Sequence, residues 1–287
     1  MVIDANLYWI PEELFTDQEL QDKLLSVIPS RYDWYAHVEE VPGTGKKQFV
    51  FEKPQGSPNL NYLQGDYVLE KQLAELNRCF HELGMKNIQL RCHYGDKYLD
   101  DPVFAPLFEK LNELKMTAYV HHTPVPVEYE AFKTYNNVRR SYGRVVDQGL
   151  AVNRELYSGM FSRYPNVRLV HSFLGGAYYA IAEMMMPHGP AKPQEVARFG
   201  TENADIRQQF KDNIFFEMSH AQPWGKRGLE FAVEMLGADH IVFGSSYPVR
   251  KEWLLEGPAF VEKLDIPEEE KALLLGGNAQ RLYQIEN

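Results

Sequence analysis

The amino-acid sequence predicts an α/β fold in which strands and helices alternate around a parallel sheet, as they do in a (β/α)8 TIM barrel. The first observation is that short apolar runs alternate, along the middle of the chain, with segments whose apolar residues recur every three or four positions. The second is that each apolar run ends in polar residues. The loops after the strands of a βα barrel build its active site, so these polar strand ends are the expected place for chemistry.

The composition is typical of a large globular chain. Of the 287 residues, 44% are hydrophobic, which is enough apolar material to bury a core and excludes a disordered chain. The net charge of −10 provides no positive field for a phosphate backbone, so we expect no nucleic-acid partner. No signal peptide or long apolar run is visible, so we expect a cytoplasmic protein without a membrane partner. No linker stands out, which predicts one domain over 1–287.

The first βα elements of the middle region are predicted between positions 69 and 95. Apolar residues at steps of three and four indicate a helix over 69–83, and Gly84 is expected to end it. A short strand is expected next, over 87–90. It leads into the polar residues 91–95, which include Arg91 and His93.

A second unit begins where Asp101 and Pro102 combine an N-cap residue with proline at the first helical position. The strand after this helix is predicted over 116–120, and it ends at the pair His121 and His122. Neighbouring strand residues point to opposite faces of a sheet, so we expect at least one of the two imidazoles to face the mouth of the barrel. Downstream, the alternation predicts a helix around 147–163, strands over 167–173, 213–219 and 240–244, and a helix that ends at Gly237.

The N-terminal third has a different pattern. Residues 34–53 are predicted to form an antiparallel β-hairpin, with the turn at 42–45. We interpret this hairpin as an insertion after the first strand and not as a barrel unit.

Several segments together resemble the amidohydrolase superfamily, specifically its amidohydrolase-2 branch, which includes 2-amino-3-carboxymuconate 6-semialdehyde decarboxylase and the resorcylate-type decarboxylases. The segments that carry the resemblance are, in chain order, Ile3–Tyr8, Tyr98–Pro102, Tyr119–His122, Tyr164–Val170 with Gly175–Gly176, Ile241–Pro248 and Gly277–Leu282. The resemblance implies a (β/α)8 barrel that acts on a small carboxylated compound, and a homodimer. The chain departs from the family after the hairpin, where the thirteen residues 54–66 are too few for two strands and a helix. We therefore expect a distorted or incomplete barrel.

The resemblance also implies a metal ion at the mouth, usually zinc, held by His-x-His on strand one, histidines on strands five and six, and an aspartate on strand eight. In this sequence the corresponding positions hold Asn6, Tyr8, His121, Phe173 and Ser246. One imidazole cannot hold a divalent ion tightly, because three or four donors are needed to offset dehydration of the metal. We therefore predict that the ancestral metal is lost. The alternative is a relocated zinc or manganese site that uses the strand-end histidines His93, His121, His171 and His220.

The candidate catalytic residues lie at these strand ends. His121 is the predicted acid/base, and Asn6, Tyr8 and Ser246 are predicted to supply hydrogen bonds where charge develops. The ring of Tyr8 could instead simply fill the old metal cavity. Arg91 is the predicted carboxylate clamp, because arginine binds carboxylates through two parallel hydrogen bonds.

Four further residues are predicted to contact the substrate: His93, His122, His171 and Glu217. His171 lies two residues before Phe173, so on a regular strand it would face the same side as Phe173, deeper in the barrel. Glu217 would be a buried carboxyl group with a raised pKa if it faces inward, and a salt bridge to a neighbouring arginine is the alternative.

Two functions are compatible with these residues. The first is an enzyme that acts on a small, carboxylated, cyclic or unsaturated compound by hydrolysis or decarboxylation. The second is a non-catalytic barrel kept as a ligand-binding or subunit-contact module. The polar strand ends favour the enzyme, because buried polar groups cost free energy unless they are hydrogen-bonded.

Overall fold

The computed structural model describes residues 1–6, 16–31, 35–40, 47–52, 69–123, 138–186, 205–247 and 250–285. The chain divides into two compact units. The smaller unit is Tyr8–Asp66, and the larger unit combines Met1–Leu7 with Tyr67–Asn287. The expectation of a single domain stays a prediction, since each unit is described by itself.

The smaller unit contains the predicted hairpin. Helix α2 (Gln18–Arg31) precedes strands β1 (Tyr35–Glu40) and β2 (Lys47–Glu52), which pair antiparallel with Tyr35 opposite Glu52. The two strands lie within the predicted limits of 34–53, and the predicted turn lies outside the described residues. The hairpin is separate from the parallel sheet, in agreement with its interpretation as an insertion.

The larger unit is built on a parallel sheet whose strand order follows the chain order β3, β6, β7, β8 and β9. Its strands are β3 (Asn87–Arg91), β6 (Thr117–His121), β7 (Arg168–His171), β8 (Ile214–Glu217) and β9 (Ile241–Val242). A short antiparallel pair, β4 (His93–Tyr94) and β5 (Lys97–Tyr98), follows β3. Each strand of the parallel sheet overlaps a predicted one. Sequential parallel strands are the order of a βα barrel, so the predicted fold class is confirmed.

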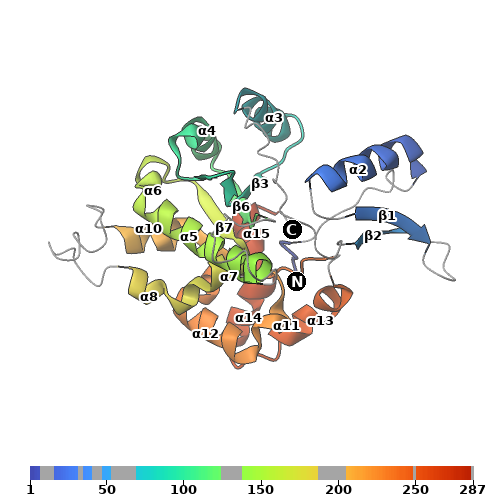
Figure 1. Cartoon of the computed structure of the whole chain (residues 1–287). Helices are drawn as coiled ribbons and strands as arrows, with labels where there is room; N and C mark the ends of the chain where they lie inside the picture. Colours follow the sequence, from blue (N-terminus) through green and yellow to red (C-terminus); the bar gives the residue numbers. More distant parts are fainter. Residues whose placement is uncertain are drawn as a thin grey trace. The chain divides into compact units, whose positions relative to one another are not determined.

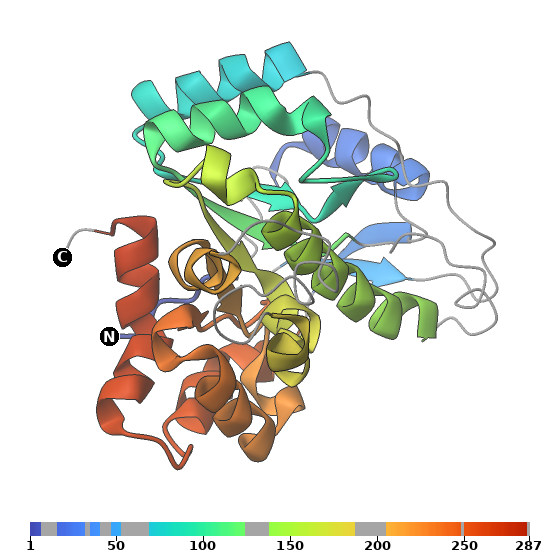
Figure 2. The same cartoon turned by 90° about the vertical axis from the view of Figure 1, so that its left-hand side faces the viewer.

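Helices alternate with these strands (Figure 1). The helical segments are α3 (Leu69–His81), η1 (Pro102–Phe104), α4 (Ala105–Leu114), η3 (Val138–Tyr142), α5 (Gly143–Tyr157), α6 (Met160–Arg163), α7 (Ser172–Ala177), η4 (Tyr178–Ala180), α8 (Ala182–Met185), α10 (Ile206–Asn213), α11 (Ala221–Trp224), α12 (Lys226–Leu236), η5 (Ala238–His240), α13 (Lys251–Val261), α14 (Glu268–Ala272), η6 (Leu273–Gly277) and α15 (Asn278–Tyr283). Helices α3 and α4 lie side by side, as Figure 2 shows.

Local sequence signals explain several of these boundaries. The side chain of Asp101 accepts a hydrogen bond from the Val103 N–H at 2.9 Å, which confirms the predicted N-cap. The helix predicted as one element over 147–163 is two, α5 and α6. Gly159 separates them with a φ of +70°, in the left-handed region where an α-helix cannot continue.

The two faces of the parallel sheet have different surroundings. We call inner face the one that carries Tyr119, Val170, Phe215 and Val242, which pack together with the N-terminal segment and α15. We call helix face the opposite one, whose residues form the main core with the surrounding helices. Because strand side chains alternate, the face of each strand-end residue follows from its position. Arg91, His121 and Glu217 belong to the inner face, and His171 belongs to the helix face.

The N-terminal segment takes the place of a first barrel strand beside β9. The Ala5 N–H donates to the Phe243 carbonyl at 2.9 Å, and the Ile3 N–H donates to the Leu275 carbonyl at 2.7 Å. On the opposite side, β3 forms the edge of the sheet within the described ranges. The described part of the barrel is therefore open, in agreement with the predicted incomplete barrel.

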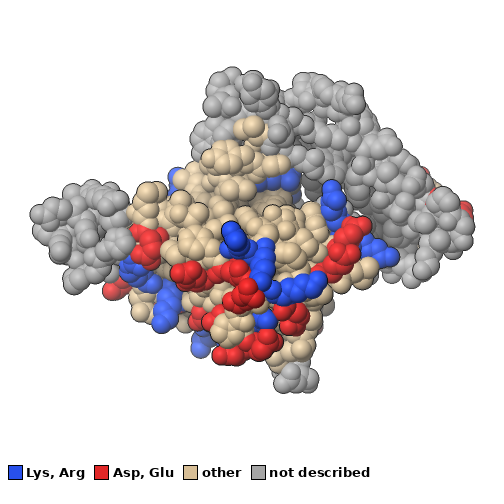
Figure 3. Space-filling view, turned by 90° about the horizontal axis from the view of Figure 1, so that it is seen from below, with Lys and Arg blue, Asp and Glu red and all other residues tan. Residues whose placement is uncertain are grey.

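Charged side chains of both signs lie on the described surface. Basic and acidic side chains lie interspersed on the face that Figure 3 shows. Among the described helices, none is both long and apolar enough to cross a bilayer.

Candidate active site

Glu217 is the centre of a buried hydrogen-bond cluster on the inner face. It closes β8, is fully buried, and its Oε2 accepts hydrogen bonds from the Tyr119 hydroxyl at 2.8 Å and the Ser219 hydroxyl at 3.0 Å. The Ser219 N–H donates to Oε1. The Asn6 amide donates to the Ser246 hydroxyl at 2.9 Å and lies 3.4 Å from Glu217 Oε2. The cluster therefore joins the first segment of the chain to the ends of β6, β8 and β9.

Burial dominates the acid–base behaviour of Glu217. Desolvation raises its pKa to about 8, and the Asp4 carboxylate adds to this effect. The hydrogen bonds from Tyr119 and Ser219 act in the opposite direction, because they stabilise the ionised form. The carboxyl group is thus protonated over much of the neutral range. Its partners in the described part of the chain are Tyr119, Ser219 and Asn6, so the arrangement there is a hydrogen-bond cluster and not a salt bridge to an arginine.

The backbone around the cluster has little free space. A Cβ atom at Gly244 would lie 1.8 Å from Glu217 Oε1 and 2.8 Å from Asn6 Cβ, so only glycine fits there. Asp4 organises the adjoining turn, because its Oδ1 accepts hydrogen bonds from the N–H groups of Ser245 and Asn6, both at 3.0 Å. The Ser245 hydroxyl donates to Oδ2 of the same carboxylate.

His121 lies on the same face, at the end of β6. Its ring centroid is 6.2 Å from that of Tyr119, and its Nδ1 lies 2.6 Å from the His122 carbonyl oxygen. A carbonyl only accepts, so Nδ1 carries the proton and Nε2 carries the lone pair in the neutral ring. The pKa of His121 is lowered to about 4, chiefly by burial and to a smaller extent by the guanidinium charges of Arg144 and Arg91. His121 is therefore a neutral base at physiological pH.

Arg91 and Arg144 bring positive charge to this strand end. Arg91 closes β3 directly opposite His121 in the parallel register, and Arg144 comes from the first turn of α5. Their effect on the pKa of His121 indicates that both charges act at its ring. Two guanidinium groups beside a neutral imidazole form a suitable environment for a carboxylate.

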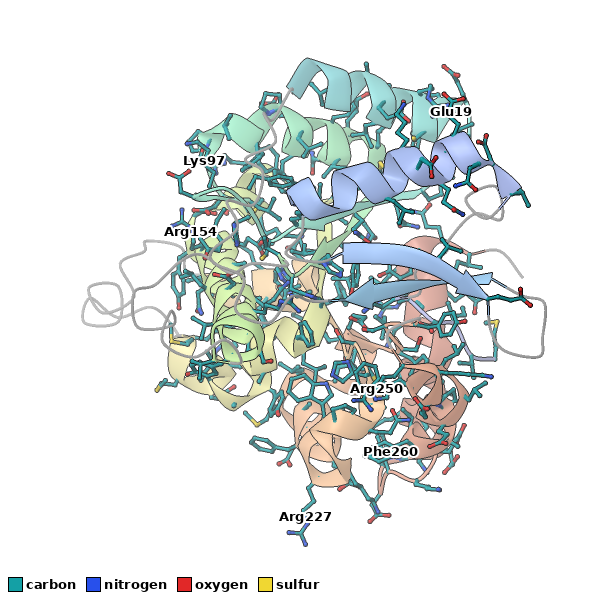
Figure 4. The ribbon with its side chains drawn as sticks, turned by 45° about the vertical axis from the view of Figure 1, so that its right-hand side comes forward. Glu19, Lys97, Arg154, Arg227, Arg250 and Phe260 are labelled. Atoms are coloured by element: carbon teal, nitrogen blue, oxygen red, sulfur yellow. The ribbon has the colours of Figure 1, made fainter. Side chains whose placement is uncertain are left out.

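A row of aromatic rings crosses the ends of strands β6, β7 and β8 and reaches helix α13. His121 stacks on His122 with ring centroids 4.0 Å apart, and His122 contacts Phe173 at 4.5 Å. Phe173 contacts His220 edge-on at 5.6 Å, and His220 stacks on Trp253 at 4.2 Å. Arg250, labelled in Figure 4, extends the row with its guanidinium carbon 5.6 Å from the Trp253 ring. Such a row offers flat apolar surface to a planar ligand.

The turn after β7 is strained where it enters this row. All residues of 173–177 have φ values between +49° and +72°, a left-handed turn that costs roughly 1–2 kcal/mol for each non-glycine residue. Gly176 is required for close approach to α5, because a Cβ there would lie 2.0 Å from the Val145 carbonyl oxygen. The turn places Phe173 beside His122 and His220.

His171 does not lie on the inner face. The prediction that it faces the same side as Phe173 is therefore wrong. Strand β7 ends at His171, and the left-handed turn begins at Phe173, so the alternation of a regular strand cannot be carried from one residue to the other. The ring of His171 is fully buried on the helix face, where it contacts Gln148 and Glu155 of α5. It is therefore not placed to contact a substrate directly.

His93 is likewise turned toward α5. Its Nε2 lies 3.1 Å from Asp147 Oδ2, and its Nδ1 lies 2.8 Å from the Gly95 carbonyl oxygen. The Tyr98 hydroxyl donates to the other oxygen of Asp147 at 2.8 Å. Arg154, labelled in Figure 4 near Lys97, lies 5.1 Å over the Tyr98 ring. The predicted contact of His93 with substrate is thus replaced by a buried contact with α5.

One of the candidate residues lies outside what the structure describes. Tyr8 is outside the described residues, so its predicted hydrogen-bonding role stays a prediction. Asn6, Ser246 and Glu217 are brought together as donors and acceptors of one cluster. Sequence reasoning missed Tyr119 and Arg144. Tyr119 could have been found, because it lies two residues before His121 on the same strand and so shares its face.

Barrel enzymes carry their active-site polar groups at the carboxyl ends of parallel strands, which is where the polar groups of this sheet lie. The amidohydrolase-2 family model, described as Amidohydrolase, matches residues 63–285. The chain therefore belongs to this amidohydrolase family, as the sequence resemblance predicts.

The relatives include two enzymes of carboxylated compounds. The 2-amino-3-carboxymuconate-6-semialdehyde decarboxylase of Dictyostelium discoideum is 26% identical over 290 residues, covering 96% of this chain and 77% of the relative. The 2-keto-4-carboxy-3-hexenedioate hydratase of a Sphingobium strain is 23% identical over 235 residues, covering 75% of this chain and 61% of the relative.

Solved structures share the fold. The 5-carboxyvanillate decarboxylase of Sphingomonas paucimobilis matches with a TM-score of 0.64 at 23% identity, over 74% of this chain and 62% of that one. A dihydroxybenzoic acid decarboxylase from Polaromonas, solved with bound manganese and an inhibitor, matches with a TM-score of 0.62 at 20% identity, over 75% of this chain and 65% of that one. This chain thus spans less than two thirds of the length of both solved structures.

The inner face does not fit a metal ion of the family type. At the positions of the family ligands, Asn6 and Ser246 are hydrogen-bonded to each other, and Phe173 presents a hydrocarbon ring. An amide nitrogen, a hydroxyl and one imidazole are a poor donor set for zinc. The relocated site built from four histidines is not formed either, because His93 and His171 are paired with carboxylates of α5.

Within the described part of the chain, one group has the composition of a metal site. Donor atoms of Cys92, His93 and Asp147 lie within 4.8 Å of one another, and all three residues are buried. Each of the three residues has a hydrogen-bond partner. The partner of Cys92 is Thr123, whose hydroxyl oxygen is 3.3 Å from the sulfur. Burial raises the pKa of the Cys92 thiol to about 12, so a metal would have to displace a tightly held proton.

We expect the metal content of the protein to be independent of His121. Because the described residues of the inner face include no group of three close His, Cys, Asp or Glu side chains, elemental analysis for zinc and manganese should give the same number of equivalents for the wild type and for His121→Ala. If the wild type retains an ion, His93→Ala should release it, since His93 belongs to the cysteine-containing group. Loss of a full equivalent in His121→Ala would instead locate the metal at the strand ends.

Proposed function

We propose that this protein is a decarboxylase of a small, carboxylated, cyclic or unsaturated compound, and that His121 is its acid–base group. The observation that carries the proposal is a pair of ionisable groups on the inner face whose pKa values are displaced in opposite directions. The pKa of His121 is lowered to about 4 and that of Glu217 is raised to about 8. A neutral base and a protonated acid are therefore available together at neutral pH.

Decarboxylation breaks a carbon–carboxylate bond and puts a proton on the carbon, so the site must hold a carboxylate and supply a proton. Arg91 and Arg144 are suited to hold the carboxylate, since their charges act at the ring of His121. When Glu217 is protonated, its carboxyl group can donate to the Tyr119 oxygen 2.8 Å away, and the Tyr119 ring lies 6.2 Å from the ring of His121. The row of rings from His122 to Trp253 supports a flat substrate by stacking.

The relatives support an enzyme of carboxylated compounds, since a decarboxylase and a hydratase of such compounds are among them, and the first of the two supports decarboxylation. The proposed partner is a small molecule. A homodimer and a cytoplasmic location remain sequence-based predictions. Metal chemistry is not part of the proposal, because the inner face provides no fitting donor set.

The proposal is tested by incubating the purified protein with a panel of hydroxybenzoates, vanillate-type acids and carboxymuconate-type unsaturated acids. We expect release of carbon dioxide and the product that carries hydrogen in place of the carboxyl group, with deuterium at that carbon in heavy water. Water addition or ester cleavage without carbon dioxide would contradict decarboxylation. Binding without turnover across the panel would contradict an enzyme of this class.

A further inference from the structure

A chain of buried polar side chains connects α5 to the histidine pair at the end of β6. His171 Nδ1 lies 3.0 Å from Gln148 Oε1, and the Gln148 amide nitrogen lies 3.0 Å from the Ser172 hydroxyl. The Ser172 hydroxyl in turn lies 3.0 Å from the backbone nitrogen of His122. Gln148, His171 and Ser172 are all fully buried, so no water competes for these hydrogen bonds.

The far end of the chain is a buried carboxyl group. Glu155 Oε2 lies 2.8 Å from His171 Nε2, a distance short enough for the two atoms to share a proton, although the angle departs from that of an ideal hydrogen bond. Burial raises the pKa of Glu155, and His171 opposes this shift. The Gln148 amide nitrogen lies 3.2 Å from the Val120 carbonyl, which can only accept, so the amide oxygen of Gln148 faces His171 and accepts a hydrogen bond from its Nδ1–H.

The direction of each hydrogen bond then follows from the number of protons available. The carbonyl of Gln148 accepts from His171, so its amide group must donate, and it donates to Ser172 and to the Val120 carbonyl at 3.2 Å. The Ser172 oxygen accepts from Gln148 and from the His122 N–H. Its single proton therefore points to another acceptor, and His122 Nδ1 lies 3.5 Å away.

These directions fix opposite tautomers for the two stacked histidines. His122 Nδ1 is an acceptor, so the proton of the neutral ring is on Nε2. His121 Nδ1 donates to the His122 carbonyl, so its lone pair is on Nε2. One ring thus carries a donor at the position where the other carries an acceptor.

We propose that Gln148, His171 and Ser172 are positioning residues that hold His121 in its Nδ1–H tautomer and His122 in its Nε2–H tautomer. The inference rests on the proposed function in one respect, since it makes His121 the base and adds His122 as a hydrogen-bond donor beside it. None of the three residues contacts the ligand in this scheme. They act through the backbone and side chain of His122.

The experiment is nitrogen-15 spectroscopy of the histidine rings at neutral pH, with signals assigned by single His→Gln variants. In the wild type, His121 and His122 should show opposite tautomers. In Ser172→Ala the loss of one hydrogen bond should lower the tautomer ratio of His122 about fivefold. Gln148→Met should also lower the tautomer ratio of His122. Ser172→Thr keeps the hydroxyl, so it should leave this ratio at the wild-type value. Ser162→Ala is the matched control, because its exposed hydroxyl only contacts Gln209.

The spectra separate this inference from the proposed function. Unchanged tautomers in both Ser172→Ala and Gln148→Met would overturn the positioning role even if the protein decarboxylates its substrates. The expected tautomer change in a protein without turnover would support the positioning role and count against the decarboxylase. With turnover present, Ser172→Ala should lower kcat more than it raises KM and should flatten the acid limb of the pH profile.

Discussion

Replacing His121 with alanine is expected to lower kcat/KM by roughly two to four powers of ten, which is the usual contribution of a positioned acid–base group. The ring is held by the His122 carbonyl on one side and by stacking on His122 on the other, so its removal leaves no equivalent base at the end of β6. The measurement is steady-state turnover of the best substrate from the decarboxylation panel.

The fold should survive this change, because His121 is half-buried and lies at a strand end. Equal circular dichroism spectra and equal urea midpoints within error are the check on folding. His81→Ala is the matched control, since His81 is an exposed residue in the last turn of α3 and should leave turnover unchanged. Full activity in His121→Ala would remove His121 from the mechanism.

Replacing Glu217 with glutamine is expected to change the pH dependence of stability. The folded pKa of about 8 lies above the ordinary value of 4.5, so the folded state binds more protons between these values. The resulting stabilisation is fully present below pH 4.5 and is lost as the pH rises through 8. The difference corresponds to a loss on the order of 5 kcal/mol in the free energy of unfolding between these limits.

Glutamine cannot ionise, so this loss should be absent from Glu217→Gln. Urea unfolding at pH values from 5 to 9 should show wild-type stability falling toward the alkaline end and a flatter profile for the variant. The lowered pKa of His121 has its effect at acidic pH, where stability is lost as the pH falls from 6.5 to 4. This loss is the same in the wild type and in Glu217→Gln. Glu234→Gln, an exposed change on α12, is the control. Parallel profiles for wild type and Glu217→Gln would show that Glu217 ionises normally.

The inner cluster lies where the sequence resemblance implies metal ligands in the family. Asn6 and Ser246 cannot replace the charge of a metal ion, but they hydrogen-bond to each other and place an amide beside Glu217. A buried carboxyl group without a cation is stable only when it is protonated or accepts several hydrogen bonds. Glu217 satisfies both conditions.

The predictions about strand-end residues divide according to the regularity of the backbone. The inward direction of Glu217 follows from strand alternation and is observed, and its complete burial raises its pKa. The direction of His171 was predicted from Phe173 and is wrong, since strand β7 ends between them and a left-handed turn follows. Sequence periodicity describes regular segments and gives no information across a strained turn.

The sequence by itself determined the parallel α/β architecture, the hairpin and the family, because periodicity and short motifs depend on residues close together in the chain. Only the tertiary structure decided which polar groups meet. Asn6 and Glu217 are 211 positions apart, and α5 supplies Asp147 to His93 and Gln148 to His171 from 54 and 23 positions away in the chain. The pKa values of His121 and Glu217 depend on burial and on such distant partners, so only the folded structure determines them.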